Sequence, residues 1–100
     1  MATIQETLPV EKKSSSDCYD AFLEAMPRAG FKIFKERAIV YLLMGQYTLN
    51  GEQVDCNLMA KPGSPTQVSI TVTSEAVSEA DLRPLADKMI AALKTELKLA

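Results

Sequence analysis

Few residue types in this sequence could carry covalent or proton-transfer chemistry, because its 100 residues include no histidine. Without histidine, Ser-His-Asp and Cys-His nucleophiles cannot be assembled, and the commonest metal ligand is missing. Cys18 and Cys56 are far apart and form no CxxC pair, which argues against a thiol metal site or a redox dithiol. We therefore expect no catalytic residues, no metal, no cofactor and no enzymatic activity.

Cys18 and three carboxylates fall within one short segment of the sequence. The dipole of a helix lowers the pKa of a thiol in its first turn, but the neighbouring Asp17 and Asp20 raise it. A packed thiol is therefore the favoured interpretation of Cys18. Asp17, Asp20 and Glu24 line one side of the predicted helix, where a solvated face is favoured over a carboxylate pair.

The charge balance excludes several classes of partner. Eleven Lys and Arg residues against thirteen Asp and Glu give a net charge of −2, which argues against a nucleic-acid-binding surface. The most apolar stretch, residues 38–49, is interrupted by polar residues and falls short of the roughly 20 residues that span a bilayer. Residues 1–10 lack the basic start and apolar run of a secretory signal. We expect a cytoplasmic chain with no nucleic-acid or membrane partner, unless an export signal precedes residue 1.

The first part of the chain predicts a strand followed by a helix. Residues 4–11 alternate with period 2, and Pro9 places this strand at a sheet edge because proline cannot donate to the ladder. Ser14 and Asp17 have the S-x-x-D spacing of a helix cap. Apolar residues at helical spacing then predict a helix from about residue 16 to 26, with the stripe Tyr19, Phe22, Leu23 and Met26.

Beyond this helix the pattern changes to strands. Gly30 can adopt the left-handed conformation that closes a helix. Glu36 and Arg37 predict a tight turn, and Asn50-Gly51 between two β-rich runs predicts a type I′ hairpin. The predicted strands are residues 31–35, 38–49, 52–60 and 66–73.

The last segment predicts a second amphipathic helix. Ser78 and Asp81 repeat the S-x-x-D cap, and Pro84 fits best if the regular helix starts near Arg83. The element order is therefore β-α-β-β-β-β-α. Two amphipathic helices need an apolar surface, which one face of an antiparallel sheet supplies. We expect one α+β domain over residues 1–100, a two-layer sandwich with a five-stranded antiparallel sheet and both helices on one face.

This element order, with the sequence G-F-K-I (residues 30–33) starting a strand directly after the first helix, resembles the TATA-binding-protein-like fold. It also resembles small bacterial domains related in shape to the helix-grip lipid-binding domains. The resemblance covers nearly the whole chain in topology and implies the sheet order first, fifth, fourth, third, second strand. The DNA-binding member of the fold uses two tandem repeats and a basic surround, and this acidic single unit has neither.

The register of the predicted hairpin separates its two faces. A two-residue turn pairs Leu49 with Glu52, and Gly45 then faces Cys56. Tyr41, Tyr47 and Ile39 are placed on the same face, under the helices. Gly45, which has no side chain, lets a helix approach closely or permits a bend in the strand.

On the opposite face, apolar side chains gather where polar ones are expected: Val40, Leu42, Met44 and Met59. Each buried side chain of this size contributes about 1.5–3 kcal/mol, which makes an exposed cluster costly. We interpret the cluster as the interface of a homodimer in which two sheet faces pack. The alternative is coverage within the same chain, or a β-bulge at Gly45 that changes the register.

The strand before the hairpin contributes to this face in one of two ways. If Glu36 and Arg37 form a two-residue turn, Phe31 and Ile33 join the outer face, whereas a three-residue loop places Phe34 there. The first option adds Phe31 to the predicted interface.

A second hypothesis concerns the inner face. Tyr41 and Tyr47 point inward by register, and their hydroxyls need partners. Together with Met26 they form the mouth of a small cavity between sheet and helices, or the tyrosines simply reach its rim. The sequence thus favours a non-catalytic interaction module that self-associates, with a binder of a small apolar ligand as the alternative.

Overall fold

The computed structural model describes residues 1–98 and contains the expected element order β-α-β-β-β-β-α. The five strands form one antiparallel sheet in the order β1-β5-β4-β3-β2, as the resemblance implied. The strand β1, which carries Pro9, is an edge strand. The elements are β1 (Ala2–Val10), α1 (Ser15–Arg28), β2 (Lys32–Arg37), the 3-10 turn η1 (Ala38–Val40), β3 (Leu42–Leu49), β4 (Glu52–Lys61), β5 (Thr66–Ser74) and α2 (Glu79–Glu96).

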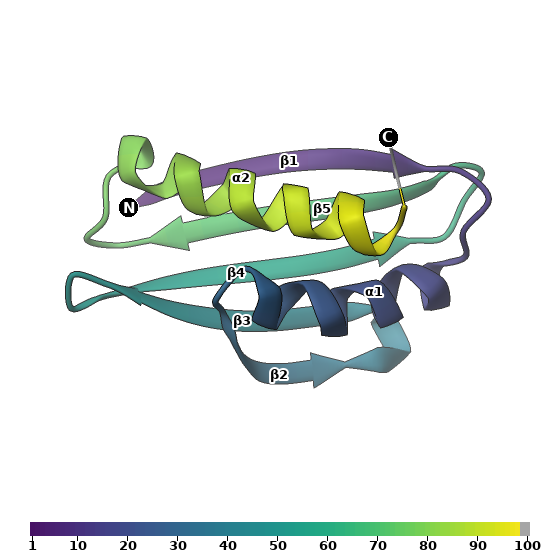
Figure 1. Cartoon of the computed structure of the whole chain (residues 1–100), viewed down its shortest axis with the longest axis horizontal. Coiled ribbons are helices and arrows are strands. Elements are labelled where there is room, and N and C mark those ends of the chain that lie inside the picture. The colour runs from purple at the N-terminus through teal and green to yellow at the C-terminus, as the bar shows by residue number, and fades with distance from the viewer. Residues whose placement is uncertain (99–100) are drawn as a thin grey trace.

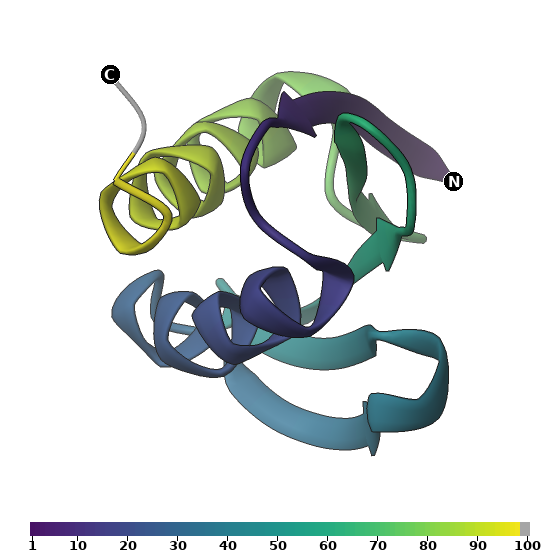
Figure 2. The same cartoon turned by 90° about the vertical axis from the view of Figure 1, so that its right-hand side faces the viewer.

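Both helices lie on the same face of the sheet (Figure 1). Helix α1 packs over β2, β3 and β4, and α2 packs over β1 and β5. The sheet curves around the pair, as the end-on view shows (Figure 2). This arrangement confirms the two-layer α+β sandwich. Its core contains the fully buried side chains Phe22, Met26, Leu43, Leu58, Ile70, Leu82, Met89 and Leu93.

Helix α1 begins with the capping box that its sequence predicts. The Ser14 hydroxyl accepts a hydrogen bond from the Asp17 N–H at 3.1 Å, and the Asp17 carboxylate accepts one from the Ser14 N–H at 3.2 Å. The helix runs slightly longer than expected, with Pro27 inside its last turn. Gly30 follows in the left-handed region with φ 87°.

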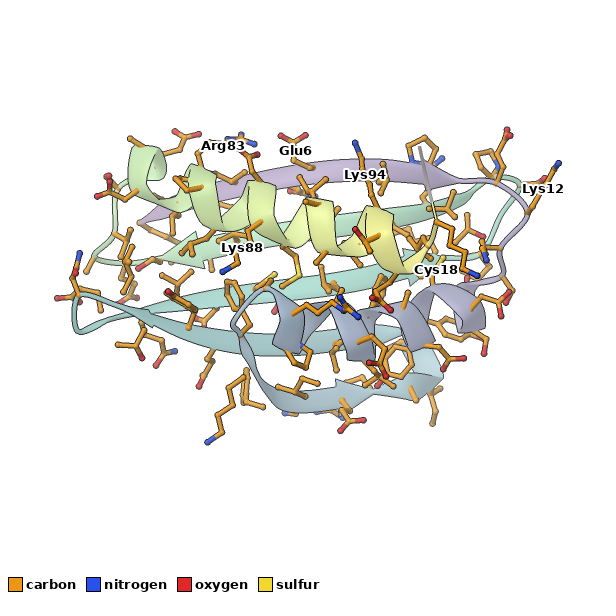
Figure 3. All side chains as sticks on the ribbon, in the orientation of Figure 1. Glu6, Lys12, Cys18, Arg83, Lys88 and Lys94 are labelled. Atoms are coloured by element: carbon orange, nitrogen blue, oxygen red, sulfur yellow. The ribbon has the colours of Figure 1, made fainter. Side chains whose placement is uncertain are left out.

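Helix α2 starts at its serine cap and is tied to the far edge of the sheet. The Ser78 hydroxyl accepts from the Asp81 N–H at 3.3 Å, and the helix continues through Pro84. Arg83 of α2 pairs with Glu6 of β1 at 3.1 Å, where the two side chains lie next to each other (Figure 3). Neither helix in the described part of the chain is long and apolar enough to cross a bilayer.

The β3–β4 hairpin has the predicted register. Leu49 pairs with Glu52 and Leu42 pairs with Met59, so no bulge shifts these two strands. Asn50 and Gly51 both have positive φ, of 51° and 82°, as a type I′ turn requires.

The connection between β2 and β3 differs from the expectation. The prediction of a turn at Glu36 and Arg37 is wrong, because β2 continues to Arg37, which pairs with Leu42. The chain reverses instead through η1 and through Tyr41, whose φ is 54°. The 3-10 turn ends the strand alternation, so Ile39, expected inside, is 95% exposed.

The two phenylalanines of this segment lie on the faces opposite to those that a two-residue turn predicts. Phe31, expected on the outer face, is only 3% exposed. Its N–H donates to the Met26 carbonyl at the end of α1, which holds it on the helix side of the sheet. A register shift between Ile33 and Lys35 leaves Phe34 unpaired in a β-bulge and half exposed.

Candidate functional site

The inner candidate site is the layer between α1 and β3. Its centre is the contact between Met26, fully buried on α1, and Gly45 of β3. A Cβ built on Gly45 would lie 2.5 Å from the Met26 Sδ, closer than real atoms approach. The thioether of Met26 therefore occupies the space that the missing side chain leaves.

Two tyrosines border this layer, on the side that the register predicts. The Tyr47 ring lies against Phe31, with ring centroids 5.3 Å apart, and Tyr41 packs half-buried against the core. The Tyr41 carbonyl accepts from the Ala60 N–H at 3.1 Å, which fixes the start of the hairpin. The structure thus places Met26, Tyr41 and Tyr47 on the helix side, and their role toward a ligand stays a prediction.

Three surface cavities within residues 1–98, with volumes of about 470, 440 and 400 Å³, lie elsewhere. One is formed by the start of β4 and the end of β5 beside Met1, one by the loops at residues 10–13 and 63–66, and one lies between α1 and the end of α2. None is lined by Met26, Tyr41 or Tyr47, because the Met26 side chain fills the inner layer.

Both thiols are packed inside the core. Burial raises the pKa of the Cys56 thiol to about 12. The pKa of Cys18 is also raised, first by burial and then by the Asp17 carboxylate. Neither thiol has the low pKa of a nucleophile. Cys56 pairs with Gly45 across the hairpin and so forms part of the apolar wall beside Met26.

Tyr19 is a buried polar residue that the sequence pattern assigned only to the apolar stripe of α1. Its hydroxyl makes no hydrogen bond in the described structure. Burial raises its pKa, and the Glu36 carboxylate raises it further. The carboxylates Asp17, Asp20 and Glu24 are exposed on the same helix, and Asp17 serves in the capping box.

The outer candidate site is the helix-free face near β2. Leu42, Met44 and Met59 lie there half-buried, while Val40 extends from η1 and is 47% exposed. The β5 part of the same face carries only polar side chains: Gln67, Ser69, Thr71 and Thr73. The apolar cluster therefore exists where the register placed it, without Phe31, and self-association through it stays a prediction.

Two further exposed apolar residues belong to this region. Phe34, expected here only as the alternative to Phe31, joins it because of the β-bulge, and Ile39, expected on the inner face, joins it because of the 3-10 turn. The positive φ at Tyr41 closes η1 directly before β3 begins, and no glycine or proline at that position indicates it in the sequence.

Comparisons with known proteins give a fold but no sequence family. No family model and no curated protein matches the chain. The chain superposes on the di-domain aromatase/cyclase BexL of the BE-7585A biosynthetic pathway with a TM-score of 0.70 at 11% identity. The match covers 99% of this chain but only 47% of BexL, so this chain spans about half the length of that structure.

Two further structures share this fold. Ara h 8.0201 matches with a TM-score of 0.59 at 10% identity, over 99% of both chains. The Zhui aromatase/cyclase from Streptomyces sp. R1128 matches with a TM-score of 0.54 at 8% identity, over 98% of this chain and 88% of the other. At these identities the likeness concerns the fold alone, which is of the helix-grip type.

These comparisons correct two expectations. The TATA-binding-protein-like assignment is not confirmed, since the neighbours are helix-grip folds. The expectation that the chain is not an enzyme is contradicted, because aromatase/cyclases occur among the structures that share its fold. The absence of histidine excludes particular nucleophiles and does not exclude catalysis as such.

Proposed function

We propose that this chain binds a small apolar ligand between the sheet and α1, in place of the Met26 side chain. The observation that carries the proposal is the contact of the Met26 Sδ with the position of the absent Gly45 Cβ. Glycine inside a strand weakens the strand and often marks a close approach of another group. In this fold that group is the tip of a flexible side chain.

Methionine is suited to such a replaceable filler. Its side chain is unbranched and has three rotatable bonds, so it can change rotamer with little cost. The neighbouring wall is apolar, because Cys56 lies opposite Gly45 and Phe22 lies on the same helix as Met26, both fully buried. A ligand in this place needs apolar surface and few polar groups.

The border of the layer supplies the polar groups that such a ligand meets. Tyr41 and Tyr47 are half-buried and pack against the core on the helix side, so a tyrosine hydroxyl is the group expected to orient a polar end of the ligand. A ligand with an apolar body and one hydrogen-bonding group fits this arrangement best.

The fold supports ligand binding more than it supports a pure interaction module. The neighbours are helix-grip folds, and two of them are aromatase/cyclases. The ligand site proposed for this chain lies between the same sheet and helices that it shares with them. Homodimerisation through the outer face has no such support from the comparisons.

Titration with the neutral fluorescent probe N-phenylnaphthylamine tests this proposal. Met26→Ala removes the side chain that must move when the ligand enters. The dissociation constant of the probe should therefore be about tenfold lower for this variant than for the unaltered chain, a gain of about 1.4 kcal/mol in binding free energy. Gly45→Val fills the same space from the sheet side and should abolish binding. Gly45→Ala provides a milder version if the valine variant does not fold.

Leu82→Ala is the matched control, because it truncates a fully buried side chain beneath the other helix. It should leave probe binding unchanged. Near-ultraviolet circular dichroism of each variant verifies that the packed core persists. Equal gains in probe binding for Met26→Ala and Leu82→Ala, or probe binding that Gly45→Val leaves intact, would disprove the site.

A further inference from the structure

We propose that the corner between β2 and β3 docks onto an anionic membrane surface, a role separate from ligand binding in the core. The corner, defined as residues 34–42, holds three of the four exposed large apolar side chains among the described residues: Phe34, Ile39 and Val40, the fourth being Met1. Ile39 is 95% exposed at the middle of η1. The end-on view shows this connection on the side of the sheet away from both helices (Figure 2).

Basic side chains surround the apolar corner on the helix-free face. Lys35 pairs with Met44 and Arg37 pairs with Leu42, so each basic residue stands beside an apolar one. Lys61 follows Met59 by two residues on β4 and therefore points to the same face. Cross-strand neighbours of this kind have side chains within contact distance.

Lys35, Arg37 and Lys61 form no ion pair within residues 1–98. The three ion pairs within residues 1–98 use Arg28 and Arg83. Glu36 is the one acidic residue in the corner, but it pairs with the buried Leu43, which assigns it to the helix side of the sheet. The nearest carboxylate on the outer part of β4, Asp55, lies four residues from Met59, roughly 13 Å along the strand.

An anionic bilayer fits this combination better than a second copy of the chain. A protruding apolar tip with a basic surround supplies the two signals of interfacial binding, insertion and attraction to anionic headgroups. A two-fold dimer centred on the same corner would bring Lys35 and Arg37 against their own copies. The outer strands of a second copy offer little negative charge in exchange, since β5 presents Gln67, Ser69, Thr71 and Thr73 there.

Co-sedimentation with vesicles tests the proposal, using phosphatidylcholine alone and phosphatidylcholine mixed with phosphatidylserine. The unaltered chain should bind only the mixed vesicles, and high salt should release it. Ile39→Ser and Arg37→Glu should each lower the partition coefficient about tenfold. Both residues are exposed, so the variants should keep the circular dichroism spectrum of the unaltered chain.

Lys88→Glu is the matched control, since it makes the same charge change on α2, on the helix side of the molecule (Figure 3). It should bind the mixed vesicles like the unaltered chain. Failure to bind any vesicle, equal binding to both kinds, or equal losses for Lys88→Glu and Arg37→Glu would overturn the proposal. So would capture by soluble polyglutamate without binding to vesicles, or a dimer in sedimentation velocity that Ile39→Ser dissociates.

Discussion

The contact between Met26 and Gly45 sets how closely α1 approaches β3. Because the Met26 Sδ stands where a Cβ of residue 45 would be, neither position can change size independently of the other. Residues that touch in this way show coupled effects on stability, in contrast to the additive effects of distant sites. The same coupling determines how much room a ligand can gain.

A double-mutant cycle tests this coupling. Gly45→Val alone should destabilise the chain by about 1–3 kcal/mol through overpacking, and Met26→Ala alone by about 2–5 kcal/mol through the cavity it leaves. In the double variant the valine fills part of that cavity, so the loss should be smaller than the sum by at least about 0.5 kcal/mol. Urea unfolding measures all three values, and strict additivity would show that the two side chains do not share the space.

Cys56 makes stability depend on pH in alkaline solution. Burial raises its pKa from 9.0 to about 12, so the folded state keeps the proton where the unfolded state has lost it. The contribution of Cys56 to the free energy of unfolding is fully present below pH 9.0 and decreases as the pH rises toward 12. The slope approaches about 1.4 kcal/mol per pH unit.

Cys56→Ala isolates this effect, because alanine has no thiol to ionise. The stability advantage of the unaltered chain over this variant should shrink when urea unfolding is repeated from about pH 8 to about pH 11. Val54→Ala, a truncation of another fully buried residue of β4, should keep a constant deficit over the same range. A constant deficit for Cys56→Ala as well would mean that the thiol ionises equally in both states.

At the level of single elements, capping determines where α1 begins. Ser14 and Asp17 exchange two hydrogen bonds across the first turn, which satisfy two backbone N–H groups that have no partner within the helix. Ser14→Ala should therefore destabilise the chain by about 1 kcal/mol. Thermal unfolding measures the loss, and Ser16→Ala, at an exposed serine of the first turn that makes no capping hydrogen bond within the described residues, should have a much smaller effect. Equal effects of the two variants would contradict the cap.

Elements with strong local signals could be predicted from the sequence, and elements fixed by distant contacts could not. Asn50-Gly51 specified the turn type, and with it the pairing of Leu42 with Met59 and of Gly45 with Cys56. The β2–β3 connection carries no glycine, proline or asparagine, so the sequence pattern could not predict its 3-10 turn or the left-handed conformation of Tyr41. For that reason Ile39 was expected inside.

The bulge in β2 explains the remaining error. One extra residue at Phe34 changes which side chains face outward, and period-2 alternation cannot locate such an insertion. Phe31 is then held on the inner face by its hydrogen bond to the end of α1, a contact between elements that a linear pattern does not contain.

For the molecule as a whole, amphipathic patterning was sufficient to predict the layers. Two apolar helix stripes and one apolar sheet face allow one economical arrangement, and the structure has it. The candidate site is a different matter. Met26, Tyr41 and Tyr47 could be placed on the inner face from the register, but the filling of that layer by the Met26 side chain depends on how α1 packs across β3.

The whole molecule also has two distinct apolar regions, and four of its five methionines lie in them, two in each. Met26 and Met89 are fully buried between the sheet and the helices, whereas Met44 and Met59 lie half-buried on the outer face. The methyl groups of these four methionines therefore report locally on whichever region a ligand enters.

Methyl NMR of the chain labelled with carbon-13 at its methionines, titrated with N-phenylnaphthylamine, tests the central claim most directly. Ligand binding between the sheet and α1 predicts that the Met26 resonance moves most, while Met44 and Met59 stay in place. Shifts confined to Met44 and Met59, with an unchanged Met26, would place the apolar ligand on the outer face and contradict the proposed function.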